Sequence, residues 1–266
     1  MRFFILGGTG FIGRHLVTYL AQQNHELDVL VRSSSKTSRF PSVCRFIQGD
    51  PLQAGPWQQE IPRADAVINL VGKNIMTRWT ERTKKEILNT RVVSTQNTVN
   101  ALEMAGESKP CLINANAVGF YPDTDDKVHT EDDLTPGDNF LAQVCLEWQN
   151  QALQATKSGV RVVIPRFGAV LARDGGVMDR VLPIFRKGLG GKISHGKQPF
   201  PWIHINDLVQ ALEFLAGHKH VHGPVNICAP QQTTNSDFTK ALSKSLKRPA
   251  LFPIPGSLLY LIFGQL

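Results

Sequence analysis

The stretch Gly7-Gly8-Thr9-Gly10-Phe11-Ile12-Gly13 decides the fold of this chain of 266 residues. It follows the apolar run Phe3-Phe4-Ile5-Leu6, and it leads into residues 14–20, where apolar side chains recur at helical spacing. The order of these three segments predicts a strand, a glycine turn and a helix.

Each glycine of the turn has a separate physical role. Gly7 permits the sharp exit from the strand, Gly10 lets the backbone approach a pyrophosphate, and Gly13 lets the helix pack against the sheet. The free N–H groups at the helix start then face the phosphates. This context is typical of a dinucleotide-binding site, and the alternative is a tight turn that binds nothing.

The second predicted strand, residues 27–31, ends where an acidic residue would bind the ribose hydroxyls of NAD. The chain has Arg32 there, followed by Ser33-Ser34-Ser35-Lys36 and, further on, Arg39. A guanidinium with hydroxyl groups suits a 2′-phosphate, so Arg32 and Ser33 favour NADP(H) over NAD(H). The alternative is a solvated basic loop.

Strands and helices continue to alternate. A strand at 44–48 ends at Asp50, whose carboxylate could accept a hydrogen bond from the adenine amino group. A buried strand at 64–71 ends at Gly72, which allows close approach to the cofactor. The next predicted elements are a helix at 80–105, a strand at 111–116, a helix at 139–157 and a strand at 161–166. This alternation predicts an α/β fold, a Rossmann-type doubly wound parallel sheet with its site at the carboxyl ends of the strands.

The apolar face expected on the helix at 80–105 consists of Ile87, Val92, Val93, Val99 and Leu102. The segment 119–138 is polar and rich in turn residues, so it is expected to form a loop over the active side of the sheet.

Shorter elements interrupted by glycine and proline follow Gly168. They are a helix at 206–216, a strand at 224–228, a helix at 235–246 and an apolar helix at 257–263. We therefore expect a Rossmann domain over residues 1–168 and a smaller, partly interleaved substrate-side lobe over 169–266.

The composition excludes several classes of protein. The net charge of +7 is spread along the chain, which fits anionic small molecules better than a nucleic acid. Four scattered cysteines suggest neither disulfides nor a zinc site, and a reducing cytoplasm is expected. The sequence shows no signal peptide and no apolar stretch long enough for a membrane span. His218, His220 and His222 alternate but have no further ligand at metal-binding spacing, so no metal site is predicted.

Ten segments spread over nearly the whole chain carry a family resemblance. They are residues 7–13, 67–72, 78–80, 90–92, 116–121, 140–148, 166–171, 188–191, 202–207 and 223–226. In these segments the chain resembles the extended short-chain dehydrogenases/reductases, and more narrowly their atypical epimerase-family group. The resemblance implies NADP(H) binding by the first lobe and a small polar substrate between the lobes. Two further implications are a homodimer formed through the two long helices and a C-terminal tail beyond Leu266, which is expected either to be truncated from this sequence or to be missing from the gene product.

The resemblance also assigns residues to the two parts of the site. The implied cofactor contacts, besides those named above, are Thr9, Phe11, Ile12, Leu70, Val71, Asn116 and Arg166. The implied substrate contacts are Lys73, Tyr121, Trp202 and His204.

The catalytic groups of ordinary members of this superfamily are missing. Those proteins carry a serine after the fifth strand and a Tyr-x-x-x-Lys motif on the next helix, where the tyrosine is the acid/base. Phe140 and Val144 take the places of the tyrosine and the lysine, and the serine region reads Asn114-Ala115-Asn116-Ala117. Other groups must therefore handle the proton if the protein is an enzyme.

Two catalytic candidates and several alternatives remain. Tyr121 could face the nicotinamide or simply line the pocket, and Asn116 could orient a substrate. His204 could titrate near neutrality or fix the second lobe, and Lys73 could hold an anionic substrate or be solvated. Cys145 is expected to be packed rather than nucleophilic.

The sequence therefore supports two hypotheses from different classes. The first is an NADP(H)-dependent oxidoreductase or epimerase that acts on a small polar compound, for example a nucleotide sugar. The second is an NADP(H)-binding regulatory or interaction protein that has lost catalysis.

Overall fold

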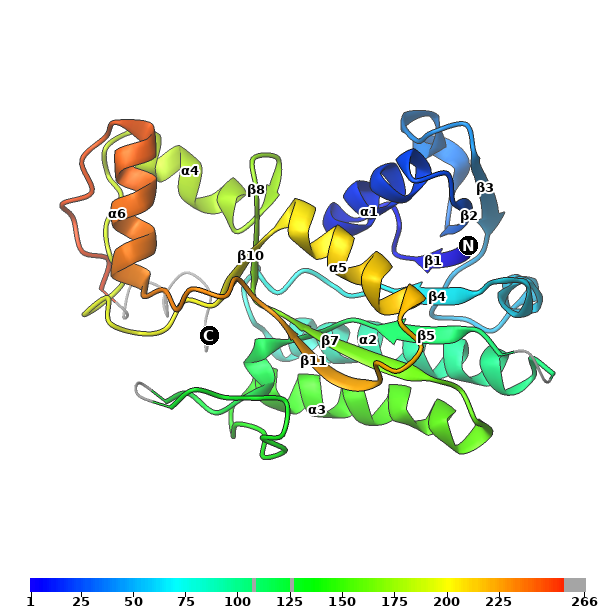
Figure 1. Ribbon diagram of the computed structural model, residues 1–266. Helices are drawn as coiled ribbons and strands as arrows, with labels where there is room; N and C mark the ends of the chain where they lie inside the picture. The colour runs from blue at the N-terminus through cyan, green and yellow to red at the C-terminus, as the bar shows by residue number, and fades with distance from the viewer. Residues whose placement is uncertain (107–108, 125–126, 256–266) are drawn as a thin grey trace.

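A computed structural model describes residues 1–106, 109–124 and 127–255. Its main element is a parallel sheet with the strand order β3-β2-β1-β4-β5-β7-β11, in which β6 also pairs with β7 (Figure 1). The strands are β1 (Arg2–Leu6), β2 (Glu26–Val31), β3 (Cys44–Gln48), β4 (Ala66–Asn69), β5 (Cys111–Asn114), β6 (Asn116–Ala117), β7 (Val162–Phe167) and β11 (Gly223–Ile227). The strand order reverses between β1 and β4, and this reversal places a binding crevice at their carboxyl ends.

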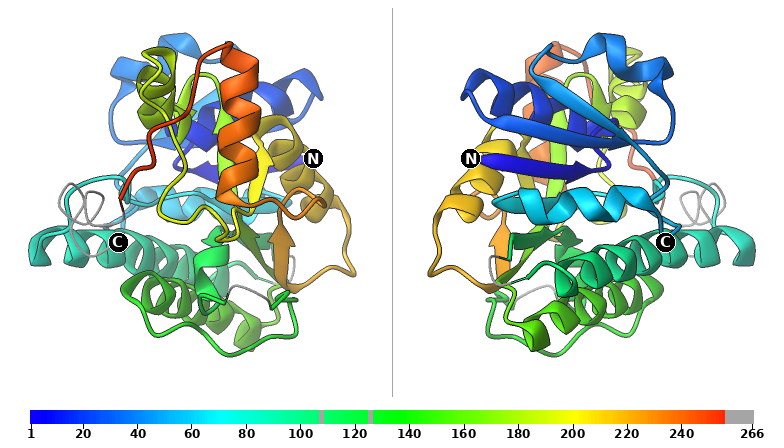
Figure 2. Two further views of the ribbon diagram at one scale, coloured as in Figure 1. Left: turned by 90° about the vertical axis from the view of Figure 1, so that its left-hand side faces the viewer. Right: turned by 90° about the vertical axis from the view of Figure 1, so that its right-hand side faces the viewer.

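Helices cover both faces of the sheet. On one face lie α1 (Phe11–Gln22) and α5 (Ile205–Gly217); on the other, α2 (Glu81–Glu103) and α3 (Phe140–Leu153) run side by side (Figure 2). Alternate residues of β1 enter different cores: Phe3 packs in the core that contains α1 and α5, and Phe4 in the core that contains α2. Burial on both faces explains why β1 is an unbroken apolar run.

Polar contacts join α1 to α5. The Tyr19 hydroxyl donates a hydrogen bond to Oε2 of Glu213 at 2.6 Å, and Nε2 of His25 lies 2.7 Å from Oε1 of the same carboxylate. These bonds link α1 and the turn after it to α5, across almost 200 residues of sequence.

A smaller lobe lies at one end of the molecule (Figure 1). It contains a second sheet of β8 (Ala169–Ala172), β9 (Gly175–Gly176) and β10 (Trp202–His204), together with α4 (Met178–Arg186) and α6 (Asn235–Leu246). Two segments after residue 168, α5 and β11, return to the main sheet. The predicted C-terminal lobe therefore shares its chain with the Rossmann layers.

The predicted elements are present with small differences. The strand expected at 111–116 is divided into β5 and β6, and the helix expected at 139–157 ends at Leu153, where the 3₁₀ helix η4 (Gln154–Ser158) begins. The loop predicted at 119–138 begins with another 3₁₀ turn, η3 (Val118–Phe120). The helix expected at 257–263 lies outside the described residues.

The predicted apolar face of α2 was wrong at Val93, which is 37% exposed. Polar Thr95 is buried instead, because its side chain has partners in the interior. Its hydroxyl lies 3.1 Å from both Nδ2 of Asn69 and Oδ1 of Asn114, and it accepts a hydrogen bond from Nε1 of Trp148 at 3.0 Å. This network ties β4 and β5 to α2 and α3 beneath the carboxyl edge of the sheet.

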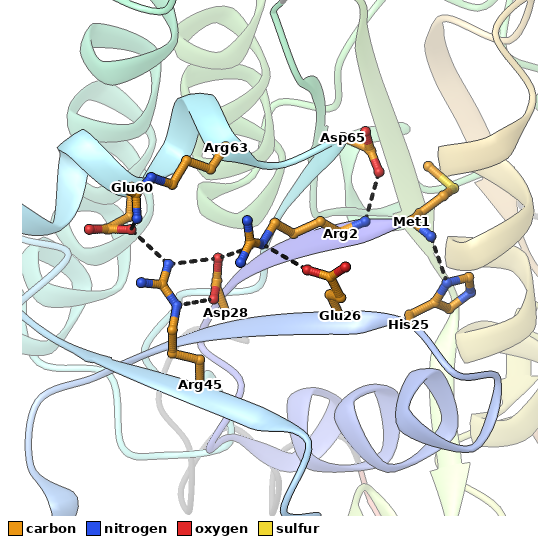
Figure 3. Close-up of polar contacts among 9 residues, drawn as sticks. All are labelled: Met1, Arg2, His25, Glu26, Asp28, Arg45, Glu60, Arg63 and Asp65. Carbon is orange, nitrogen blue, oxygen red and sulfur yellow. Dashed lines mark hydrogen bonds and ion pairs between the residues drawn. The ribbon is translucent and has the colours of Figure 1, made fainter.

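An ion-pair network occupies the opposite edge of the sheet (Figure 3). The buried Asp28 carboxylate on β2 accepts two hydrogen bonds from Arg45 on β3, at 2.6 and 3.0 Å, and its Oδ2 lies 3.3 Å from Nε of Arg2 on β1. Arg45 also contacts Glu60 of η2 (Pro56–Arg63) at 2.7 Å. These charges pair with one another and join the amino ends of the first three strands. They lie away from the crevice, so we assign them a role in stability and not in ligand binding.

Candidate cofactor site and active site

The glycine turn has the geometry that its sequence predicts. Parallel pairing aligns Leu6 with Asn69, so the following residues, Gly7 and Leu70, lie side by side. Gly7 has φ +80°, and a Cβ there would lie 2.9 Å from the Leu70 carbonyl carbon. A Cβ at Gly13 would lie 2.2 Å from the Gly7 oxygen, closer than any side-chain carbon can approach. Both positions therefore require glycine.

The start of α1 forms a cradle for an anion. Gly10 is the N-cap residue with an extended backbone; no side chain of the described residues caps the helix, and its first turn contains no acidic residue. Thr9 and Gly10 are exposed, whereas Phe11 and Ile12 are half-buried. The N–H groups of this first turn can bind phosphate oxygens, so the cradle fits a dinucleotide pyrophosphate.

A cavity of about 820 Å³ lies mainly between α1 and α5, and its walls also include Thr9 of the turn and Arg39. Arg32 and Ser33, both exposed, follow the carboxyl end of β2. Asp174 of the β8–β9 hairpin pairs with Arg14 at 3.0 Å, which lowers the pKa of this aspartate despite its partial desolvation. Basic side chains thus gather near the end of β2, where the sequence predicts a 2′-phosphate contact.

Asp50 follows β3, at the same edge of the sheet. Its Oδ1 accepts a hydrogen bond from the Leu52 N–H at 3.0 Å and forms a local turn. The predicted contact of Asp50 with adenine stays a prediction.

The segment after β4 carries a role that the sequence analysis did not assign. A Cβ at Gly72 would lie 3.0 Å from Cζ of Arg91 on α2, so Gly72 allows a close protein contact here, whether or not a cofactor also approaches it. Val71 donates its N–H to Oδ1 of Asn69 at 3.1 Å.

Lys73 forms a hydrogen-bonded ion pair with Glu86, and this interaction lowers the pKa of the Glu86 carboxyl. Lys73 therefore shares the Glu86 carboxylate with Arg82, whose Nε lies 3.0 Å from Oε1 of Glu86.

Asn116 and Cys145 lie together in the interior. Nδ2 of Asn116 donates to the Cys145 carbonyl oxygen at 3.0 Å, and Oδ1 of Asn116 accepts from the Ala117 N–H at 2.8 Å. Burial raises the pKa of the Cys145 thiol to about 11. The thiol is therefore neutral near pH 7, and Cys145 packs as expected.

Tyr121 is buried, and its hydroxyl is bonded to several protein groups. It accepts a hydrogen bond from Nη1 of Arg166 at 2.8 Å, and it lies 2.8 Å from Oδ1 of Asn226 and 3.0 Å from the Thr130 oxygen. These contacts attach the loop after β6 to β7 and β11. A role for Tyr121 in proton transfer stays a prediction.

Arg166 lies in the protein interior with no exposed surface. Nη2 donates to Oε1 of Gln149 at 2.8 Å, and Cζ lies 3.8 Å from the centroid of the Phe120 ring. These groups are partners that a buried guanidinium needs, and only its Nε has no hydrogen-bond partner among the described residues. These contacts give Arg166 a structural role, and its predicted cofactor contact stays a prediction.

The positions of the missing catalytic pair are used for packing. Phe140 contacts the Trp79 ring with centroids 5.3 Å apart, and Val144 is buried between Trp79 and Ile87. Neither side chain can transfer a proton.

Trp202 and His204 support the smaller lobe. Nε1 of Trp202 donates to Oγ1 of Thr233 at 3.2 Å. His204 is exposed and caps α5, because its Nδ1 accepts the N–H of Asn206 at 3.2 Å. These contacts support the alternative in which His204 fixes the second lobe. A substrate contact of Trp202 or His204 stays a prediction.

The three alternating histidines do not lie on a strand, because β11 begins at Gly223. His218 stacks on Phe214 with ring centroids 3.6 Å apart. Among the described residues, no three histidine, cysteine or acidic side chains are grouped as metal ligands would be. The described helices also include none that is both long and apolar enough to cross a membrane.

Comparison with known proteins identifies the family. Residues 3–228 match the model of the NAD dependent epimerase/dehydratase family. The chain belongs to this family. Its relatives include the epimerase family protein YfhF of Bacillus subtilis, 33% identical over all of this chain and 86% of the relative. The chloroplastic SDR39U1 homolog of Arabidopsis thaliana is 35% identical over 98% of this chain and 75% of the relative.

Among solved structures, the human epimerase family protein SDR39U1 with NADPH is similar over the whole chain. The TM-score is 0.85 at 32% identity, and the match covers 86% of the human chain. A nucleoside-diphosphate sugar epimerase from Corynebacterium glutamicum has a TM-score of 0.77 at 30% identity, over 98% of this chain and 54% of the other. This epimerase-family chain is therefore an atypical extended short-chain dehydrogenase/reductase.

In this family member, sequence reasoning missed one residue at the crevice. Arg91 belongs to a segment that carries the resemblance, but no role followed from its place on a predicted helix. It is half-buried, its Cζ lies 5.1 Å from the centroid of the Trp148 ring, and burial lowers its pKa. Gly72 and Arg91 are 19 positions apart, and nothing in the sequence around either residue indicates that they are in contact.

Proposed function

We propose that this protein binds NADP(H) and acts as an oxidoreductase or epimerase on a small polar substrate. The observation that carries the proposal is the uncapped start of α1, built from glycines that no other residue can replace. The human relative whose structure contains NADPH shares the fold over the whole chain, which supports the same cofactor here.

The preference for NADP(H) over NAD(H) rests on the charge near the end of β2. Arg32 occupies the place of an acidic ribose ligand, and Arg39 lines the adjoining cavity, whereas Arg14 is paired with Asp174. A guanidinium pairs well with a phosphate and has no such partner on an unphosphorylated ribose.

Bound NADP(H) would supply or accept a hydride, and the residues of this chain would hold and enclose the reactants. The first turn of α1 would bind the pyrophosphate, while the Asn69–Thr95–Asn114 network keeps the ends of β4 and β5 fixed beneath the crevice. The loop attached through Tyr121 would limit access of water. Tyr121 remains the candidate proton donor, with Asn116 as the candidate substrate orienter.

Two measurements test this proposal in sequence. Calorimetry is expected to show saturable binding of NADPH and weaker binding of NADH, and wild-type protein that binds neither would contradict the cofactor assignment. A screen of carbonyl compounds should then find NADPH oxidation that Tyr121→Phe abolishes. Oxidation that persists unchanged in this variant would remove Tyr121 as the proton donor.

A second candidate function is an NADP(H)-binding regulatory protein without catalysis. Phe140 and Val144 favour it, because they pack in the interior at the positions of the missing catalytic pair. The carbonyl screen separates the two functions: saturable NADPH binding without turnover of any compound supports the regulatory protein.

A further inference from the structure

Two cationic side chains, Lys73 after β4 and Arg91 on α2, lie beside each other at the crevice. Among the described residues, only Lys73 is paired with an acidic group. Lys73 contacts the Glu86 carboxylate. Arg91 uses Nη1 to donate to the carbonyl oxygens of Lys73 at 3.1 Å and Ile87 at 3.0 Å. The described residues provide no carboxylate for Arg91 and no hydrogen-bond acceptor for its Nε or Nη2. Its full positive charge therefore stays uncompensated at the edge of the sheet.

The surroundings of Arg91 hold its guanidinium in one orientation. A Cβ at Gly72 would lie 3.0 Å from Cζ, 3.1 Å from Nη2 and 3.3 Å from Nε. Because Cζ is the nearest of the three, Gly72 packs against the flat face of the group rather than against its edge. The two backbone acceptors fix Nη1, and Trp148 packs alongside. The edge formed by Nε and Nη2 remains available for a ligand.

That edge has a definite ligand preference. Nε–H and Nη2–H are parallel donors, and they match the two oxygens of a carboxylate. A fixed guanidinium loses little conformational freedom when it binds, so the site is pre-organised.

The position of Arg91 separates it from the phosphates of the cofactor. The pyrophosphate cradle and the cavity lined by Arg39 belong to the α1 face of the sheet, whereas Arg91 extends from α2 on the other face. Its neighbour Trp148 lies on α3 one turn beyond Cys145, whose carbonyl holds Asn116. Arg91 thus lies beside Lys73 and near the segment that holds Asn116, two of the candidates for substrate contacts.

We propose that Arg91 binds a carboxylate group of the substrate through Nε and Nη2. This inference rests on the proposed function, in which a substrate occupies the crevice beside the cofactor. It narrows the substrate class to small polar compounds that carry a carboxylate. It also transfers to Arg91 the anion-binding role that the sequence suggests for Lys73.

The test is a calorimetric titration with oxalate, and separately with inorganic phosphate, in the presence and absence of saturating NADP⁺. Wild-type protein is expected to bind oxalate saturably and more tightly than phosphate. Arg91→Met should weaken oxalate binding by roughly 10- to 100-fold, as expected for the loss of charge-assisted hydrogen bonds. Arg91→Lys should fall between the two, since it keeps the charge and loses the paired donors.

Arg161→Met is the matched control. Arg161 precedes β7 and also donates to backbone carbonyls, those of Leu215 and Val221 by Nη1 and that of Ala216 by Nη2. It lies at the amino end of the strand, away from the crevice, so oxalate binding should stay within about twofold of wild type. Circular dichroism checks that each variant is folded. If Arg91→Met does not fold, the oxalate affinity of Arg91→Lys is the test.

Four results would overturn the inference. They are no saturable oxalate binding by the wild type, tighter binding of phosphate than of oxalate, unchanged oxalate binding in both Arg91 variants, or a loss of NADP⁺ affinity in Arg91→Met as large as its loss of oxalate affinity. Failure of the cofactor proposal is distinguishable, because it appears as absent NADP⁺ binding by the wild type while the cofactor-free titration still reports on Arg91.

Discussion

Replacing Gly13 by alanine tests whether the packing of α1 sets the geometry of the phosphate cradle. The added Cβ would lie 2.2 Å from the Gly7 oxygen and 2.6 Å from the Gly8 Cα, and both are backbone atoms. No rotamer change can relieve this overlap, so the turn and the helix must separate by about an ångström. Overpacking of this kind costs about 1–3 kcal/mol. The better helix propensity of alanine offsets about 0.5–1 kcal/mol of that cost.

The net loss of about 0–2.5 kcal/mol corresponds to a fall in Tm of at most roughly 10 °C for a chain of this size. The same displacement moves the N–H groups of the cradle, and losing one charge-assisted hydrogen bond would raise the Kd for NADPH about 10- to 100-fold. Thermal unfolding and calorimetry measure the two effects.

Gly217→Ala is the control for this experiment, because a Cβ there meets no atom within 4 Å and the position is the last residue of α5. It should leave NADPH affinity unchanged and raise stability by at most about 1 kcal/mol. If Gly13→Ala binds NADPH as tightly as Gly217→Ala, the cradle does not depend on this packing.

Three further predictions concern single groups. Arg32→Ala should raise the Kd for NADPH roughly 10- to 100-fold and leave that for NADH within about twofold; equal effects on both cofactors, measured by calorimetry, would exclude a 2′-phosphate contact. The hydrogen bond to Glu213, with burial and the nearby charge, raises the pKa of Tyr19 from 10.0 to about 12. The stability that this shift contributes is therefore complete below pH 10 and lost as the pH rises through 12, and an ultraviolet titration should show a late tyrosinate that Tyr19→Phe removes. The pKa of Asp133 is lowered from 3.8 to about 2, first by the Lys127 hydrogen bond and then by the Thr130 N–H. Its contribution is present above pH 3.8 and lost as the pH falls through 2, so hydrogen exchange around residues 127–133 should rise over that interval, and Asp133→Asn should abolish the dependence.

The features that the sequence predicts best are local ones. The turn from Gly7 to Gly13 could be predicted because each glycine is explained by neighbours within a few residues or by the next strand. The alternation of strands and helices follows from the periodicity of apolar residues, and the structure confirms the parallel sheet that it implies.

The features that the sequence missed depend on contacts between distant segments. Val93 looked like a core residue because valine is apolar, but Thr95 is buried in the core because Asn69, Asn114 and Trp148 satisfy its hydroxyl. Lys73 and Glu86 are 13 positions apart, and nothing in either segment indicates that they pair.

The residues assigned from the resemblance show the same limit. The resemblance implies a cofactor contact for Arg166, but it gives no sign that the register of Arg166 beside Asn116 and Asn226 also buries it inside the protein. Pattern matching identifies a position, while the direction of a side chain depends on what surrounds it.

The bonds between Tyr19, His25 and Glu213 have a consequence for how the chain is made. Translation produces β1 and α1 before α5, and the helix that covers α1 is completed only after about 190 more residues. At about 5–20 residues per second, this delay is roughly 10–40 s. During that time α1 can pack against β1 and β2 but not against α5, so the core that these helices share is incomplete on the ribosome. An early segment of the cofactor site is thus fully covered only when α5 has been synthesised.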